Sequence, residues 1–188
     1  MPGQFPLVGT MAALQEEHFQ GADMPTIDPT LRPGKVTKWG EWVKSKPLVV
    51  NGFETRWRIL GKYDLVSTND DGTIGLIDCK VSDSQRDSGQ FYSPQLEAYA
   101  YSLENPAAGK SQTVASIGLL VWKPTTAIGT SPENYGFGVF QKYVPVERDQ
   151  ANFLKVIGEF IDVLEGELPE PGSECQTCNY LKARSALD

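Results

Sequence analysis

The chain has 188 residues, of which 40% are hydrophobic and 22% are charged, and its formal net charge is −7. This size and composition are typical of one soluble globular domain with a hydrophobic core. Its longest apolar runs, such as Gly118–Trp122, are far too short to cross a bilayer. The first residues show neither a basic leader nor an unbroken apolar run, so we expect a cytoplasmic protein that does not associate with membranes.

Positive charge is concentrated in residues 32–62. This segment holds 8 of the 17 Lys and Arg residues but only 2 of the 24 Asp and Glu residues, which leaves 9 basic and 22 acidic residues elsewhere. Such asymmetry is compatible with a basic strip that contacts phosphate groups, and equally with a solvated face that happens to be basic.

The amino-terminal third predicts a helix, a loop and strands. Residues 12–20 predict a short helix, and the prolines of residues 21–34 predict a loop along the surface. The Asn51-Gly52 dipeptide lies between runs rich in β-branched and aromatic residues, which predicts a hairpin. Residues 57–68 predict a further strand.

A second hairpin follows, with a three-residue loop between Asn69 and Thr73 and with Gly72 in a left-handed conformation. In this register Asp64 lies opposite Asp78. Because side chains alternate along a strand, one face carries Lys62, Asp64, Asp78 and Lys80, and the other carries Tyr63, Ile77 and Cys79. Like charges placed opposite each other are destabilising, so the pattern indicates a bound cation or a surface ion-pair network with the two lysines.

The second half alternates helices and strands. Residues 89–105 predict a helix that begins near Ser93-Pro94, with proline at the first helical position. Its apolar stripe is Leu96, Ala100 and Leu103, and a polar stripe beside it contains Tyr92, Gln95, Tyr99 and Ser102.

Strands are predicted at residues 114–122 and 135–146, followed by a helix over residues 148–165. The expected core face of that helix is Phe153, Ile157, Phe160, Ile161 and Leu164. Tryptophans can stack on bases, but among apolar residues they usually lie in the core, so no role is assigned to Trp39, Trp42, Trp57 and Trp122.

Three short motifs occur in a characteristic order: Gly61-x-x-Asp64, then Ile77-Asp78-Cys79-Lys80, then Gln95-x-x-x-Tyr99. Together they resemble the PD-(D/E)XK nuclease superfamily, and within it the RecB-like exonuclease branch. The resemblance runs from about Lys44 to Tyr180. It implies an α/β protein with a restriction-endonuclease-like core, in which helices flank a central mixed β-sheet. We expect one domain over residues 1–188, with a helix remnant and surface loop (1–34), a core (35–168) and a tail (169–188).

The resemblance also implies an activity, which is metal-dependent hydrolysis of DNA phosphodiesters, as an exonuclease in repair, recombination or the processing of phage or mobile-element DNA. Asp64, Asp78 and the backbone carbonyl of Cys79 would bind Mg²⁺ or Mn²⁺. Lys80 would orient the attacking water and stabilise the transition state, and Gln95 and Tyr99 would contact phosphate or position Lys80. The alternative is a nucleic-acid-binding or assembly protein that kept the fold but lost efficient catalysis.

Two further features correspond to metal sites in relatives. His18, the single histidine, lies where the RecB-like branch places a histidine ligand, with Glu17 as its substitute. A lone histidine is more often an ordinary surface or core residue. Cys175 and Cys178 lie where some members bind an iron–sulfur cluster through four cysteines. Because Cys79 is the only other cysteine, we expect a remnant without a cluster.

Overall fold

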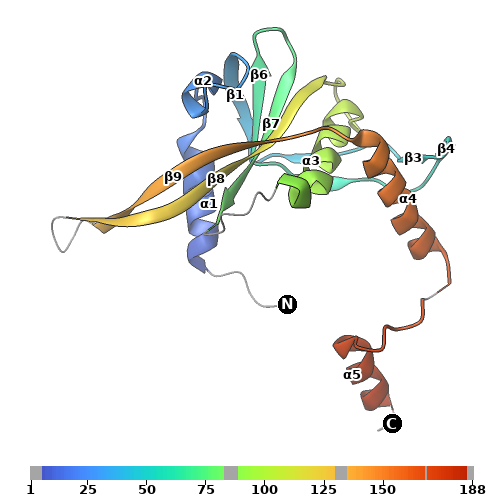
Figure 1. The fold of residues 1–188 in the computed structure, drawn as a ribbon. Helices are drawn as coiled ribbons and strands as arrows, with labels where there is room; N and C mark the ends of the chain where they lie inside the picture. Colours follow the sequence, from blue (N-terminus) through green and yellow to red (C-terminus); the bar gives the residue numbers. More distant parts are fainter. Residues whose placement is uncertain (1–5, 83–88, 130–134, 168, 186–188) are drawn as a thin grey trace.

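The structure is a computed structural model that describes residues 6–82, 89–129, 135–167 and 169–185. Its centre is a five-stranded sheet with the order β1-β6-β7-β8-β9. The strands are β1 (Gly34–Trp39), β6 (Leu65–Asn69), β7 (Ile74–Val81), β8 (Val114–Gly129) and β9 (Tyr135–Val146). β7 and β8 run parallel, and the other neighbours run antiparallel. The mixed sheet flanked by helices that the sequence predicts is confirmed (Figure 1).

Helices cover both faces of the sheet. On one face, α3 (Gly89–Glu104) places Leu96 and Ala100 against Val66 and Leu76 of the sheet. On the other face lie α1 (Pro6–His18) and α2 (Met24–Ile27). Alternation along β6 and β7 explains this arrangement, because successive side chains enter opposite cores.

The carboxyl-terminal helices lie outside these two layers. α4 (Gln150–Glu165) packs beside α3, whereas α5 (Gln176–Ser185) contains no buried residue (Figure 1). None of the described helices is long and apolar enough to span a membrane. Residues 169–185 therefore follow the folded core as a tail without a core of its own.

Both predicted hairpin turns are confirmed. Asn51 and Gly52 have φ values of 52° and 82° and join β3 (Val49–Val50) to β4 (Phe53–Glu54), as a two-residue turn with positive φ at both positions requires. Gly72 has φ +80°, and the Asn69 amide donates to the Thr73 carbonyl at 2.8 Å. Leu65 pairs with Ile77 and Thr68 with Ile74, which is the expected register.

The first 34 residues contribute more to the core than the sequence predicts. The first helix begins at Pro6 rather than near residue 12. The expected surface loop buries Met24, Ile27 and Leu31, which pack with Leu65 and Ile77. The prolines of this segment interrupt regular secondary structure, but its apolar residues still pack on the face of the sheet opposite α3.

The prediction of one continuous strand over residues 57–68 is wrong, because two separate strands occur in this region. β5 (Leu60–Lys62) pairs with β2 (Trp42–Lys44) in a separate two-stranded ribbon, and β6 then joins the central sheet. The interruption falls at Tyr63 and Asp64. There the Asp64 carbonyl accepts from the Gly40 amide at 2.9 Å, and the Asp64 side chain accepts from the Cys79 amide at 2.7 Å. A side chain thus replaces a main-chain partner where the chain changes sheets.

Two predictions for the later helices are corrected. α3 begins at Gly89, so Pro94 lies inside the helix rather than at its start. Proline has no amide hydrogen to donate, and both Pro94 and Gln90, whose carbonyl lacks this donor, are exposed. In α4, Phe153 is buried, but Phe160 and Leu164 are 59% and 60% exposed. Ile157 and Ile161 still pack against the buried cluster that contains Phe153, so the core contacts only part of the apolar stripe.

β8 is longer than the predicted strand over residues 114–122. It continues to Gly129, and beyond Trp122 it pairs only with β9, so that the two strands form an arm that projects from the sheet (Figure 1). Ile128, Tyr135 and Phe137 on this arm are exposed. The arm therefore presents apolar side chains without a described partner.

A buried charge network connects α3 to the start of α4. Arg148 Nε donates to both carboxylate oxygens of Glu97 at 3.0 Å, and its terminal nitrogens donate to Glu104 at 3.0 and 3.1 Å. The amide of Asp149 also donates to Glu97 at 2.6 Å. Glu97 is only 1% exposed, so its charge depends on these partners.

We expect Arg148→Ala to destabilise the protein by about 3 kcal/mol, because it leaves the Glu97 carboxylate buried with an amide as its remaining donor. Arg56→Ala is the matched control: Arg56 pairs with Glu165 at the surface, where an ion pair contributes less than about 1 kcal/mol. Urea unfolding of both variants measures the difference. Equal losses would contradict the role of the buried network.

Candidate active site

Two carboxyl groups approach each other where β6 and β7 pair. Asp78 lies in β7 and is only 2% exposed, and Asp64 directly precedes β6. The register of β6 and β7 pairs Leu65 with Ile77, so Asp64 and Asp78 lie directly beyond this pair, at the same end of the paired region. Asp64 Oδ2 accepts a hydrogen bond from the Cys79 amide at 2.7 Å, which fixes this carboxylate against β7. The predicted juxtaposition of Asp64 and Asp78 therefore occurs in the folded protein.

α3 brings two polar side chains to Asp78. Gln95 Nε2 donates to Asp78 Oδ1 at 3.1 Å and to the Tyr99 hydroxyl oxygen at 3.0 Å. Gln95 and Tyr99 are one helical turn apart and therefore lie on the same side of α3. A Cβ atom on Gly61 would lie 2.5 Å from the Tyr99 ring, so glycine at this position of β5 permits the close approach of the ring.

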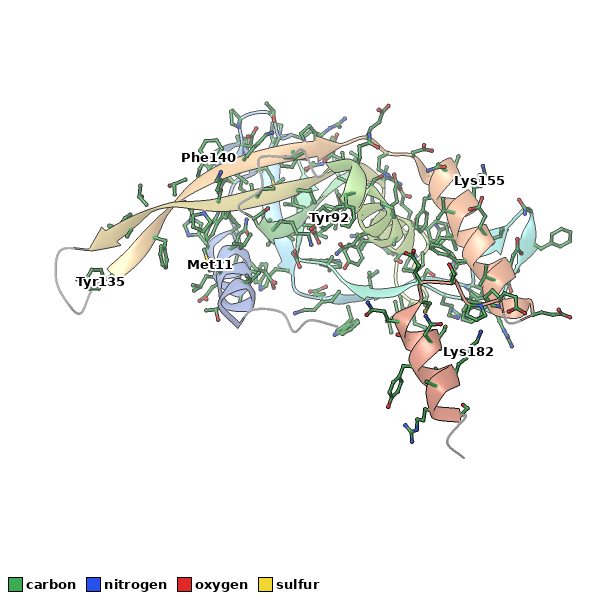
Figure 2. The ribbon with its side chains drawn as sticks, turned by 60° about the horizontal axis from the view of Figure 1, so that its bottom comes forward. Met11, Tyr92, Tyr135, Phe140, Lys155 and Lys182 are labelled. Atoms are coloured by element: carbon green, nitrogen blue, oxygen red, sulfur yellow. The ribbon has the colours of Figure 1, made fainter. Side chains whose placement is uncertain are left out.

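Lys80 completes the cluster from the same strand. Its Nζ lies 2.6 Å from Asp78 Oδ2 and 4.6 Å from the centre of the Tyr92 ring. Figure 2 shows Tyr92 on α3, next to the sheet. Burial is the largest single effect and lowers the pKa of Lys80, but the charge and close contact of Asp78, together with the charge of Asp64, leave the pKa above its ordinary value. Lys80 is thus a protonated ammonium group held between a carboxylate and an aromatic face.

Burial disfavours the charged form of both acids, and the charge of Asp64 adds to this effect at Asp78. Burial, and then the charge of Asp64, raise the pKa of Asp78 to about 6, although Lys80 acts in the opposite direction. Burial also raises the pKa of Asp64 against the effects of the Cys79 amide and the nearby lysines. The approach of Lys80 to Asp78 Oδ2 is that of an ion pair, and this oxygen has no partner in hydrogen-bonding geometry among the described residues.

These properties fit a hard divalent cation. Mg²⁺ and Mn²⁺ prefer carboxylate and carbonyl oxygens, and a cation would offset the repulsion that Asp64 exerts on Asp78 and would compete with Lys80 for Asp78 Oδ2. Among the described residues, no group of three or more His, Cys, Asp or Glu side chains is arranged to hold a metal ion. Two carboxylates are therefore the protein side chains available here, with backbone oxygen and water as further ligands.

The comparison with known families identifies the chain. A sequence model described as the PD-(D/E)XK nuclease superfamily matches residues 13–183. The protein belongs to this superfamily. No curated protein matches the chain. Among solved structures, the crystal structure of SSO0001 is 17% identical with a TM-score of 0.43, and the match covers 77% of this chain and 58% of that one.

The superfamily assignment agrees with the expectation from the three motifs. The nuclease superfamily motif residues Asp64, Asp78, Lys80, Gln95 and Tyr99 all lie in one cluster. Their individual roles, and membership of the RecB-like branch, stay predictions. The side chain of Cys79 points into the opposite core with Ile77, as expected.

Tyr63 does not lie on the face that the sequence predicts. It packs with Val66 and Leu76 on the α3 side of the sheet, and its hydroxyl donates to Glu41 at 2.7 Å. The interruption between β5 and β6 breaks the alternation of side chains at this residue. The prediction assumed that side chains alternate along one continuous strand, and it therefore assigned Tyr63 to the wrong face of the sheet.

The first helix presents a different acid from the one predicted. Glu17 and His18 are both exposed, and the His18 ring lies 4.8 Å from the Phe19 ring and 5.9 Å from the Trp122 ring. Burial, and then the charge of Asp64, raise the pKa of Glu16, while Lys62 opposes this effect. Glu16 is thus the residue of α1 that lies near the acidic cluster formed by Asp64 and Asp78. Whether His18 or Glu17 binds metal stays a prediction.

The hydrophobic pattern of residues 12–20 does not indicate that Glu16 lies near the carboxylates. Leu14 is 54% exposed, whereas Gln15 is fully buried and donates to the Leu120 carbonyl at 2.7 Å. Gln15 and Phe19, four residues apart, define the buried side of this segment, and Glu16 follows on its edge. Because the buried position is occupied by a polar residue, the hydrophobicity pattern does not show which side of the helix faces the core.

We expect the free energy of unfolding of the metal-free protein to fall as pH rises from the ordinary Asp value of 3.8 to about 6. The folded state binds the Asp78 proton more tightly than the unfolded state, so stability present at low pH is lost through this window, by on the order of 2 kcal/mol. Urea unfolding in chelator measures the fall. Asp78→Asn removes the titrating group, and an unchanged pH dependence in this variant would contradict the assignment.

We expect Gly61→Ala to displace Tyr99 and disrupt its hydrogen bond with Gln95, at a loss of about 1–3 kcal/mol of stability from overpacking. The matched control is Gly9→Ala in α1, where an added Cβ meets no atom within 4 Å and where alanine favours the helix by up to about 1 kcal/mol. Thermal unfolding distinguishes the two variants. If Gly61→Ala were as stable as the parent protein, the close packing of Tyr99 would not be a constraint.

Proposed function

We propose that the protein is a Mg²⁺- or Mn²⁺-dependent deoxyribonuclease that hydrolyses phosphodiester bonds at the Asp64–Asp78–Lys80 cluster. The observation that carries this proposal is Asp78, a buried carboxyl group with a raised pKa and one oxygen without a hydrogen bond among the described residues. Exonuclease action in repair, recombination or mobile-element processing rests on the resemblance to the RecB-like branch. DNA and a divalent cation are the partners that this function requires.

In this proposal, Asp64, Asp78 and the Cys79 carbonyl hold the cation. When bound, the ion supplies Lewis acidity and positive charge at the phosphate. Gln95 keeps Asp78 in one orientation through its hydrogen bond to Oδ1, and Tyr99 in turn orients Gln95. These contacts leave Lys80 as the partner of the other oxygen of Asp78, Oδ2.

Lys80 acts on the attacking water and on the charge that develops on phosphate. In the metal-free protein its ammonium group lies against Asp78 Oδ2, the same oxygen that would bind a cation. Competition for this oxygen would release Lys80 toward the substrate, while the Tyr92 ring keeps it near the site. A donor directed at developing negative charge contributes roughly a hundredfold or more to the rate.

The test is hydrolysis of end-labelled DNA with Mg²⁺, with Mn²⁺ and with chelator. We expect activity only with metal, and we expect Asp78→Ala and Lys80→Ala each to lower it by about 100-fold or more. Lys155→Ala on the exposed side of α4 is the control for Lys80 and should retain full activity (Figure 2). Circular dichroism establishes that each variant is folded.

Metal binding is followed separately through thermal stability. Mn²⁺ should raise the melting temperature of the parent protein and leave that of Asp78→Ala unchanged. Cleavage that survives both active-site substitutions would show that another site or a contaminant is responsible. DNA binding without cleavage in either metal would instead support a nucleic-acid-binding protein that kept the fold.

A further inference from the structure

The ribbon formed by β2 and β5 has two different faces. Trp42 pairs with Lys62 across the ribbon, and Lys44 pairs with Leu60. Val43 and Gly61 lie on the inner face, where Val43 is buried and Gly61 meets the Tyr99 ring of α3. The outer face consists of four exposed residues, Trp42, Lys44, Leu60 and Lys62. Trp42 is 70% exposed, although tryptophans among apolar residues usually lie in the core.

The outer face begins next to the acidic cluster. Lys62 is two residues before Asp64, and its charge opposes the rise in pKa of both Asp64 and Glu16. The inner face of the same ribbon contacts Tyr99, which is hydrogen-bonded to Gln95. The ribbon is therefore fixed to the candidate active site from one side and open to solvent on the other.

The charges of the outer face are available for a ligand. Three other cations of residues 32–62 are neutralised by acids from elsewhere: Arg32 pairs with Asp71, Lys35 with Asp23 and Arg56 with Glu165. Lys44 and Lys62 form no salt bridge with any described residue. Two cations without such partners thus flank an exposed indole on one short ribbon.

We propose that the outer face of the β2–β5 ribbon binds an unpaired nucleic-acid strand, with Trp42 stacked on a base and with Lys44 and Lys62 on its phosphates. This inference rests on the proposed function and names the substrate class, a single strand or an unpaired end. Aromatic stacking beside a positively charged track is the general mode of single-strand binding. Double-stranded nucleic acid fits this face less well, because the bases of a duplex are stacked on each other and their faces are covered. A protein partner also fits less well, because lysine is depleted in protein–protein interfaces.

The test measures binding in an Asp78→Asn background with chelator present, so that no hydrolysis occurs. Fluorescence anisotropy compares a labelled oligothymidylate with a duplex of equal length. We expect Trp42→Ala to weaken single-strand binding by at least about 5-fold, and Trp42→Phe to retain most of the affinity. Phe53→Ala is the matched control, because Phe53 is 77% exposed on β4, outside this ribbon.

Salt dependence tests the lysines. Lys44→Gln should reduce the slope of log affinity against log salt by about 0.7, the value for one phosphate contact on a single strand. Unchanged affinity in Trp42→Ala, or an equal loss in Phe53→Ala, would overturn the proposal. A change in sedimentation with Trp42→Ala would overturn it too, since this result would show that the face joins two copies of the chain.

The outcomes separate the two proposals. Trp42-dependent binding in a protein that never cleaves DNA would support the proposal for the ribbon and contradict the proposed nuclease activity. Metal-dependent cleavage with the same kcat/KM in Trp42→Ala and in the parent protein would support the nuclease activity and contradict the proposal for the ribbon.

Discussion

The carboxyl group of Asp78 is almost completely removed from water, and its neighbours only partly compensate for this. Gln95 hydrogen-bonds one oxygen, Lys80 places a charge beside the other, and Asp64 adds repulsion. The result is a pKa raised to about 6 and an oxygen without a hydrogen bond among the described residues. Such an arrangement destabilises the fold when Asp78 is ionised, and strongly perturbed acids of this kind are concentrated at functional sites.

The rest of the fold holds the partners of Asp78 in place. Gln95 depends on the position of α3, and α3 is tied to the start of α4 by the buried contacts of Glu97 with Arg148. Tyr99 depends on the absence of a side chain at Gly61, which links α3 to the β2–β5 ribbon. Packing far from the carboxylates thus contributes to the geometry between them, because a small shift of α3 would move Gln95 away from Asp78.

The strengths and failures of sequence-based prediction have separate physical causes. The hairpin register followed from local rules, since a three-residue turn with Gly72 in a left-handed conformation fixes which residues are opposite. The prediction for Tyr63 failed because the chain changes sheets at that point, which no local pattern shows. Glu16 was overlooked because Gln15, a polar residue, occupies the buried position of α1. The exposure of Phe160 and Leu164 on α4 was misjudged because an apolar stripe does not show how much of it the core covers.

The sequence alone indicated most of the helices and strands, the closeness of Asp64 to Asp78 and the shared face of Gln95 and Tyr99, because periodicity and turn chemistry act over a few residues. The mixed sheet flanked by helices was implied by the resemblance to the nuclease superfamily. Only the tertiary structure decided that Gln95 reaches Asp78, that Lys80 lies between Asp78 and Tyr92, and that Glu16 faces the cluster. It also decided that Trp42 remains exposed. These contacts join residues far apart in the chain, and their burial depends on which elements cover each face of the sheet, which local patterns do not encode.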